Sequence, residues 1–135
     1  MSKIRLQIIS PRKVLYDGEC NMIEYNTTEG YVGILPGHIA MTQILAPGKL
    51  TIYEEGNPTP KYMTAMSGVV KILPDTVMVL LEIGEYKDEI NVERAKAALE
   101  RAKRKLEEIK DTFDIERTKY ALKKAEVRLE VAAIE

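Results

Sequence analysis

The chain has 135 residues, with 20 basic and 21 acidic side chains and a formal net charge of −1. This length supports one compact core, or one core with an appendage. The balanced charge argues against nucleic-acid binding through bulk positive charge, so any charged partner must be met by a local patch.

Cysteine content and hydropathy indicate the redox compartment of the chain and how it can associate with a membrane. The single cysteine, Cys20, cannot form an internal disulfide, and its place in the alternating run 20–25 predicts a buried small hydrophobe and a reducing compartment. No apolar run approaches the roughly 20 residues that span a bilayer, and the N-terminus lacks the long apolar core of a signal peptide. Membrane association is therefore expected to be indirect.

The first two thirds of the chain are typical of short β-strands. In residues 3–8 polar and apolar residues alternate, which puts Ile4, Leu6 and Ile8 on one face of a strand. Glycine- and proline-containing turns, such as Asp17-Gly18, separate most of the runs, and this spacing predicts a sandwich or barrel of mostly antiparallel strands. Further strands are predicted over residues 14–16, 20–25, 31–35, 39–45, 50–53, 62–66, 69–72 and 77–83. Residues 77–81 are apolar on both faces, so we expect a central strand covered on both sides.

The loop over residues 28–38 is the most distinctive in this part. Pro36 fixes its own backbone dihedral, Gly37 can take the positive φ of a tight turn, and Gly33 permits unusual conformations or close contacts. The local chemistry favours a rigid corner, and a rigid exposed loop is also a common contact surface.

The pattern of reactive side chains indicates no catalytic residue and no metal site. His38 is the only histidine, Cys20 has no second ligand nearby, and neither Ser10 nor Ser67 lies in a nucleophile-elbow sequence. No phosphate-binding glycine loop is present. His38 is therefore interpreted as solvent-exposed or facing a partner.

After residues 85–95 the sequence has no glycine and no proline, and its apolar period changes from two to three and four. The change predicts a hinge between a β domain, residues 1–86, and a helical domain, residues 87–135. Asn91 is a candidate N-cap of a first helix, and Asp114 of a second one. The predicted apolar seams are Ala95, Leu99, Ala102, Leu106 and Ile109 on one helix and Thr118, Leu122, Ala125, Leu129 and Ala132 on the other. Two such helices joined by a short turn should form an antiparallel hairpin.

The basic residues of this hairpin allow two interpretations. They are interleaved with acids, which is typical of a solvated face, but they could also form a patch for an anion or an acidic partner. Lys124 and Arg128 are like charges one turn apart, which costs a little unless an anion lies between them. The residues concerned are Arg94, Arg101, Lys103, Arg104, Lys105, Lys123, Lys124 and Arg128.

Several strings, taken in order, resemble the epsilon subunit of F-type ATP synthases, of the bacterial type. They are Asp17-Gly18, the loop Glu29-Gly30-Tyr31-Val32-Gly33-Ile34-Leu35-Pro36-Gly37-His38, the turn Ser67-Gly68, the stretch from Ile90 to Ala95, and residues 120–129. The resemblance covers the whole chain. It implies a flattened antiparallel β-sandwich followed by a C-terminal antiparallel two-helix hairpin, as the residue patterns also predict.

The resemblance also implies a function. It implies a non-catalytic central-stalk (rotor) subunit of a proton- or sodium-translocating ATP synthase, peripheral at the cytoplasmic face of the cell membrane and associated with the membrane only through the complex. The β domain would pack on the gamma subunit and the c-ring, with Tyr31, Gly33 and His38 at the interface. The regulatory hairpin would extend toward the catalytic beta and alpha subunits and inhibit ATP hydrolysis. No nucleic-acid partner and no required cofactor is implied.

In some bacterial members the folded hairpin binds ATP as a regulatory ligand. By position, the residues that match their binding site are Glu85, Ile90, Asn91, Arg94, Ala95, Lys124 and Arg128, with Arg101 as a further candidate. Asn91 stands where those members have an acid, and Lys124 where they have an arginine. These two departures put ATP binding in question for this chain.

A different class of protein remains open at this point: a free-standing β-sandwich adaptor whose hairpin binds another protein as a coiled-coil partner. Co-purification with gamma and the catalytic subunits would favour the rotor interpretation. A stable monomer that does not bind these subunits would favour the adaptor. An enzyme is the least favoured of the three interpretations.

Overall fold

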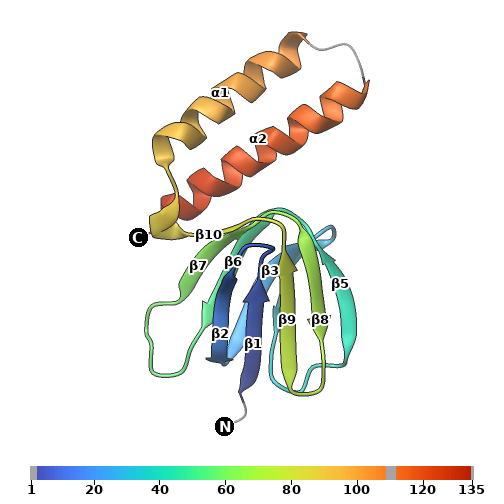
Figure 1. Ribbon diagram of the computed structural model, residues 1–135, viewed down its shortest axis with the longest axis vertical. Helices are drawn as coiled ribbons and strands as arrows, with labels where there is room; N and C mark the ends of the chain where they lie inside the picture. Colours follow the sequence, from blue (N-terminus) through green and yellow to red (C-terminus); the bar gives the residue numbers. More distant parts are fainter. Residues whose placement is uncertain (1–2, 109–111, 135) are drawn as a thin grey trace. The chain divides into compact units, whose positions relative to one another are not determined.

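The computed structural model describes residues 3–108 and 112–134, and it separates into two compact units, Met1–Tyr86 and Lys87–Glu135 (Figure 1). The first is built of strands and the second of helices. The predicted class, a β-sandwich followed by two helices, is confirmed. No helix in the described ranges is long and apolar enough to cross a bilayer.

Ten strands make up the described part of the first unit: β1 Ile4–Ile9, β2 Val14–Cys20, β3 Met22–Thr27, β4 Gly30–Ile34, β5 Met41–Leu45, β6 Gly48–Tyr53, β7 Lys61–Ala65, β8 Gly68–Ile72, β9 Thr76–Leu81 and β10 Gly84–Tyr86. Their order in the sheet is β10-β7-β6-β3-β5-β8-β9-β1-β2, with β4 added to β3. Neighbours are antiparallel except β1 and β9, which pair in parallel.

One hydrophobic core holds this unit together. The predicted inward face of β1 is confirmed, because Ile4, Leu6 and Ile8 are buried. Residues from β3 and β6, in the other half of the sheet, belong to the same core, so the sheet folds over on itself into two layers (Figure 1). Burying each such side chain contributes about 1.5–3 kcal/mol to stability.

The turn predicted at Asp17-Gly18 is wrong, because β2 continues through it. Gly18 pairs with Leu6 of β1, and a Cβ at Gly18 would lie 3.3 Å from the Tyr16 hydroxyl oxygen, so the missing side chain leaves room for the Tyr16 ring. As a result Cys20 ends β2 instead of opening the next strand. Cys20 is buried, as predicted, and burial raises the pKa of its thiol to about 11.

Two further strand predictions need correction. β9 lies centrally between β8 and β1, but it is not covered on both faces, because Leu80 is 41% exposed. β10 was not predicted. It is only three residues long, and it is held by antiparallel pairing with β7 and by a hydrogen bond from the Tyr86 hydroxyl to the carbonyl oxygen of Leu15 at 2.6 Å.

The second unit contains a short 3-10 turn, η1 Lys87–Glu89, and two helices, α1 Val92–Glu108 and α2 Thr112–Ala132. Asn91 caps α1 as predicted: its Oδ1 accepts a hydrogen bond from the backbone N–H of Arg94 at 3.0 Å. Asp114 is not the cap of α2. The helix already begins at Thr112, so Asp114 lies in its first turn, where its charge favours the helix dipole.

The antiparallel hairpin is confirmed (Figure 1). The small seam residues Ala95, Ala102, Thr118 and Ala125 are buried, while the seam leucines are half-buried. Ile109 lies outside the described residues. On another side of α2, Val127 and Val131 are fully buried, which the predicted seam did not include.

Candidate functional site

A cavity of about 280 Å³ lies between α1 and α2. Alanine and threonine side chains form its apolar part, and long cationic side chains form its sides. The lining residues are Ala98, Arg101, Ala102 and Lys105 of α1, and Arg117, Thr118, Ala121 and Lys124 of α2. Every lining residue therefore belongs to the helical unit.

Helical spacing explains why these residues meet. On α1, Arg94, Ala98, Arg101 and Lys105 follow one another at steps of four, three and four residues, so they share one face. Each of them directly precedes a seam residue. The face therefore borders the contact between the helices.

A matching face exists on α2. Arg117, Ala121, Lys124 and Arg128 have the same spacing and again directly precede the seam residues. Ala98 and Ala121 interrupt the two rows of cations with small side chains, and both line the cavity. The space between the helices exists because these positions carry a methyl group in place of a long side chain.

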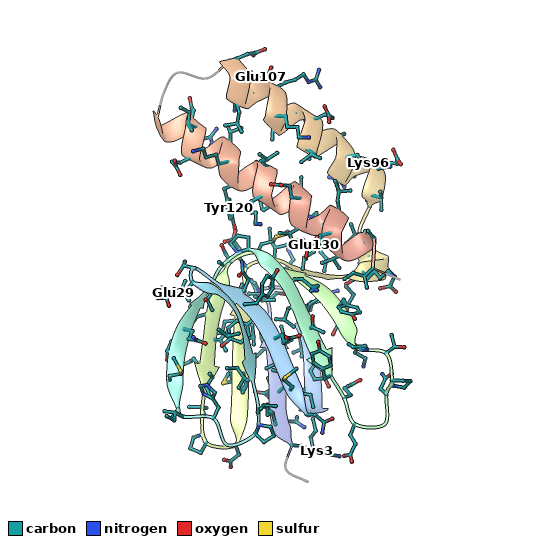
Figure 2. The ribbon with its side chains drawn as sticks, turned by 180° about the vertical axis from the view of Figure 1, so that it is seen from behind. Lys3, Glu29, Lys96, Glu107, Tyr120 and Glu130 are labelled. Atoms are coloured by element: carbon teal, nitrogen blue, oxygen red, sulfur yellow. The ribbon has the colours of Figure 1, made fainter. Side chains whose placement is uncertain are left out.

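The cations that line the cavity differ from other cations of the helices in their pairing. Within residues 3–108 and 112–134, no carboxylate forms an ion pair with Arg101, Lys105, Arg117 or Lys124. Other lysines of the helices do pair: Lys96 with Glu93 at 3.8 Å and Lys119 with Glu116 at 3.9 Å. Lys124 Nζ lies 4.9 Å from the centroid of the Tyr120 ring, a cation–π contact. Figure 2 shows the side chains of both helices, with Lys96 and Tyr120 labelled.

The structure brings together only some of the residues predicted for a nucleotide site. Arg101 and Lys124 line the cavity from opposite helices. Ile90, Asn91, Arg94 and Ala95 lie at the start of α1, and Arg128 lies one turn beyond Lys124; none of these five lines the cavity.

Glu85, the remaining predicted residue, belongs to the first unit. It lies in β10, where its backbone N–H donates to Thr64 Oγ1 at 2.9 Å.

The sequence analysis does not single out Arg117, which lines the cavity. It includes Lys105 among basic residues that form either a solvated face or a patch for an anion, without assigning it to a site. Their spacing carried the signal, because Arg117 lies two helical turns before Lys124 and Lys105 one turn after Arg101.

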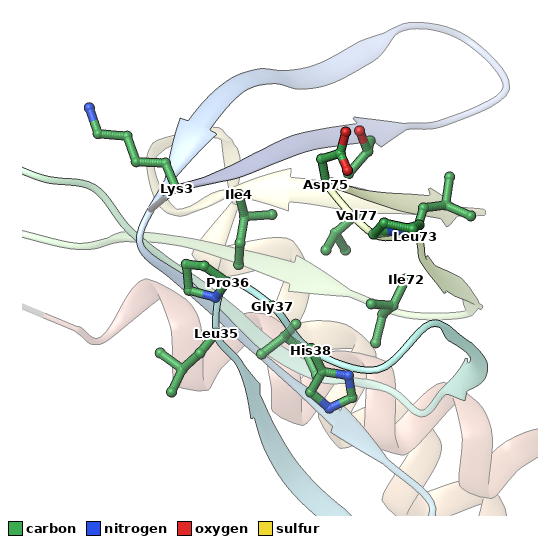
Figure 3. Close-up of a pocket in the computed structure, with 13 residues that line it drawn as sticks. Lys3, Ile4, Leu35, Pro36, Gly37, His38, Ile72, Leu73, Asp75 and Val77 are labelled. Atoms are coloured by element: carbon green, nitrogen blue, oxygen red, sulfur yellow. The ribbon is translucent and has the colours of Figure 1, made fainter. Parts of the chain in front are cut away.

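In the β unit, the turn Leu35–His38 lies beside the loop between β8 and β9, where Leu73 and Asp75 are found (Figure 3). The hollow between them has a volume of about 20 Å³, room for about one water molecule. Gly37 has φ +83°, as predicted for the tight turn. His38 is half-buried, and its Nδ1 lies 2.8 Å from the carbonyl oxygen of Ile39. A hollow of this size is too small for a ligand larger than water.

Tyr31 and Gly33, the other predicted contact residues, lie in β4. The Tyr31 ring is half exposed, and its hydroxyl accepts a hydrogen bond from the backbone N–H of Lys49 at 3.0 Å. A Cβ at Gly48 would lie 2.8 Å from this hydroxyl, so the glycine makes room for it. Gly33 does not have a positive φ, and a Cβ there would make only ordinary contact with Met22 Sδ at 3.4 Å.

An apolar row crosses the outer face of the sheet. Ile44 of β5 is opposite Val69 of β8, Val69 is opposite Leu80 of β9, Leu80 is opposite Ile9 of β1, and Ile9 is opposite Val14 of β2. Their neighbours Val70, Val79 and Ile8 are fully buried, so the row itself faces outward. Ile44 is 72% exposed and Val14 59% exposed, which makes the row an apolar surface.

In residues 3–108 and 112–134, no group of three or more His, Cys, Asp or Glu side chains is placed so that it could hold a metal ion.

Comparisons with known proteins agree with this two-part architecture. Residues 3–86 match the family model described as the ATP synthase delta/epsilon chain β-sandwich domain, and residues 88–133 match the one described as the ATP synthase delta/epsilon chain long α-helix domain. The chain is 35% identical to an ATP synthase epsilon chain of Brevibacillus brevis, over 80% of this chain and 81% of the relative. It is 39% identical to that of Alkalihalophilus pseudofirmus, over 78% of each chain.

Among solved structures, a chain of the Euglena gracilis mitochondrial ATP synthase, in a structure of OSCP, F1 and the c-ring, aligns with a TM-score of 0.85 and 26% identity, covering 99% of this chain and 83% of that one. A chain of the Tetrahymena thermophila mitochondrial ATP synthase central stalk and c-ring aligns with a TM-score of 0.61 and 18% identity, which shows the fold. Both units of the chain thus match the same family in the same order, and the chain belongs to the epsilon subunits of F-type ATP synthases, of the bacterial type.

Proposed function

We propose that this chain couples rotation to ATP synthesis as a non-catalytic central-stalk subunit, and that its two units have separate roles. The β unit attaches to the rotor, and the helical unit regulates ATP hydrolysis. The similarity to a chain solved together with F1 and the c-ring supports the first role. On this proposal the chain is peripheral at the cytoplasmic face of the membrane, and the host enzyme moves protons or sodium ions.

The apolar row on the β unit is the observation that carries the attachment role. Soluble monomers rarely expose a contiguous apolar patch without a binding purpose. Ile44 and Leu80 are too exposed to contribute much to the core of this unit, so a partner that covers them would gain about 25 cal/mol for each Å² of apolar surface removed from water. We assign the row to the gamma subunit, and the surface of β4 and the turn after it, with Tyr31, Gly33 and His38, to the c-ring.

Co-purification tests this assignment. The pair Ile44→Asp and Leu80→Asp places charges in the row and should weaken binding of gamma by at least about tenfold, because a buried charge would lack a partner. Thr42→Asp is the matched control, since Thr42 is the next outward position of β5 and is exposed. Circular dichroism checks that all variants fold. If the paired variant binds gamma as tightly as the control does, the row is not the attachment surface.

The regulatory role rests on the helical unit. Its seam buries mainly alanine and threonine, which remove little apolar surface from water, so the closed hairpin has a small margin of stability. A ligand at about a hundred times its dissociation constant adds ~2.7 kcal/mol to the state it binds. ATP held between α1 and α2 would keep the hairpin closed. Without ATP the hairpin would extend and bring its basic residues to acidic segments of the catalytic alpha and beta subunits, inhibiting ATP hydrolysis.

A further inference from the structure

The cations of the hairpin are distributed along its whole length. Because the helices are antiparallel, Arg94 at the start of α1 and Arg128 toward the end of α2 mark one end of the pair. Arg101 and Lys124 occupy the middle. Lys105 and Arg117 mark the other end, next to the connection between the helices. The residues expected to bind ATP account for the first end and the middle, and leave the last pair of cations without a role.

We infer that the cavity binds a polyphosphate chain, either that of a nucleotide or an inorganic one, and that Lys105 and Arg117 hold its far end. This inference rests on the proposed ATP-binding role of the hairpin. It assigns to the site two cations that do not match the binding residues expected by resemblance.

The volume of the cavity supports a phosphate chain over a whole nucleotide. Pockets that enclose a drug-sized ligand measure about 300–1,000 Å³, and this one measures about 280 Å³. A nucleotide would therefore place only part of itself here. The nucleoside would extend toward Asn91 and Ala95, which do not line the cavity.

The lining residues also favour a negatively charged ligand. Ala98, Ala102 and Ala121 present only methyl groups, so nothing on these three side chains can read the edge of a base. Four cations without an ion pair in the described ranges supply many N–H donors, and the arginine forks match phosphate oxygens in geometry. The Thr118 hydroxyl is the one neutral side-chain hydrogen-bonding group of the lining, so the site favours a ligand that carries several negative charges.

Because two of these cations come from each helix, a bound polyphosphate would join α1 to α2 directly. Without it, the like charges of Lys105 and Arg117 face one cavity and oppose closure. The number of phosphates should consequently set both the affinity and the stability of the closed hairpin.

Isothermal titration calorimetry on the full chain tests the inference, with sodium tripolyphosphate, ATP and adenosine at one fixed ionic strength. We expect tripolyphosphate to bind and to displace ATP, and adenosine to give no heat. Lys105→Gln with Arg117→Gln should weaken tripolyphosphate binding by at least about tenfold, because charge-assisted hydrogen bonds are lost while helix propensity is kept.

The control is Lys103→Gln with Arg104→Gln, which removes the same charge from exposed positions that do not line the cavity. It should change the affinity by less than about threefold, the effect of screened surface charges. Circular dichroism at 222 nm checks helix content, and the exchange Lys105→Arg with Arg117→Lys should retain binding. If ATP binds while tripolyphosphate does not, or if both Gln pairs bind equally, the inference is wrong and nucleotide binding stands. If neither ATP nor tripolyphosphate binds, both fail.

Discussion

The backbone N–H of Arg94 donates a hydrogen bond to Asn91 Oδ1 at 3.0 Å, which makes Asn91 the N-cap of α1. Asn91→Ala should destabilise the helical unit by about 1 kcal/mol, because an N–H at the helix start loses its acceptor. Asn91→Asp keeps the acceptor and adds a charge that favours the helix dipole, so its stability should equal or exceed that of the parent. Thermal unfolding followed at 222 nm measures both, and an Ala variant as stable as the parent would show that the cap contributes nothing.

The β unit should fold without the helices. A fragment of residues 1–87 retains every strand and the hydrogen bond from Tyr86 to Leu15, so we expect a β-sheet circular dichroism spectrum and cooperative unfolding. A shorter fragment, residues 1–81, lacks β10 and leaves the edge of β7 unpaired; it should be less stable. An unfolded 1–87 fragment would contradict the division into two units.

Inhibition of ATP hydrolysis should depend on the basic residues of the helices. Replacing Arg101, Arg104, Lys123 and Arg128 together with Ala removes the charges that would meet acidic segments of the catalytic subunits. Hydrolysis by the assembled enzyme should rise, while the amount of assembled enzyme stays the same. Unchanged hydrolysis would instead identify these side chains as a solvated face.

ATP binding should improve when the two departures from the ATP-binding pattern are reversed. Asn91→Asp restores a charged acceptor and Lys124→Arg a planar fork, and each should tighten binding by about tenfold, as charged hydrogen bonds exceed neutral ones by roughly 1–1.5 kcal/mol. Arg94→Ala should abolish binding measured by calorimetry, whereas Lys96→Ala, which removes a cation already paired with Glu93, should not. Absence of heat from both the parent and the double restoration would exclude a nucleotide site in the hairpin.

The stability of the β unit should depend on pH through Glu54. The Tyr16 hydroxyl donates to Glu54 Oε2 at 2.6 Å, and this hydrogen bond is the main cause that lowers the pKa of Glu54, with Lys61 adding to it. A carboxyl whose pKa is lower in the folded state stabilises the fold above its unfolded pKa of about 4.3. That stabilisation is lost as the pH falls through the folded pKa.

Tyr16→Phe should therefore flatten the loss of stability between about pH 5 and pH 3, measured as the free energy of unfolding in urea. Tyr53→Phe is the matched control, because it removes a tyrosine hydroxyl that donates to a different carboxylate, Glu24. A Tyr16→Phe profile parallel to that of the parent would show that the hydrogen bond does not set the pKa of Glu54.

Local patterns predicted the elements better than they predicted the surfaces. The alternation of Ile4, Leu6 and Ile8 and the capping residue Asn91 act over a few residues, and both predictions are confirmed. The turn at Asp17-Gly18 failed because pairing with β1 and packing of the Tyr16 ring outweigh local turn preference.

The apolar row and the cavity could not be predicted from local sequence patterns alone. The apolar row depends on the register of five strands that no single stretch of sequence reveals. The cavity depends on how two helices face each other: spacing puts Arg117 on the same face of α2 as Lys124, but only the packing of α2 against α1 shows that this face lines a cavity. What the sequence did contain was the shared spacing of the two cationic faces, which anticipates the meeting of Arg101 and Lys124.

The parallel pairing of β1 with β9 has a consequence for the order of events during biosynthesis. β1 is made before β9, its parallel partner, which emerges only after most of the β unit has been synthesised, so the sheet cannot close before then. Contacts between segments far apart in sequence require closure of a long loop and slow folding. Until that moment β1 has one unpaired edge, which is where misassembly with another nascent chain would begin. The helices, whose contacts are local, can form within microseconds of leaving the ribosome, so the helical unit, which is made after the β unit, should fold faster than the β unit does.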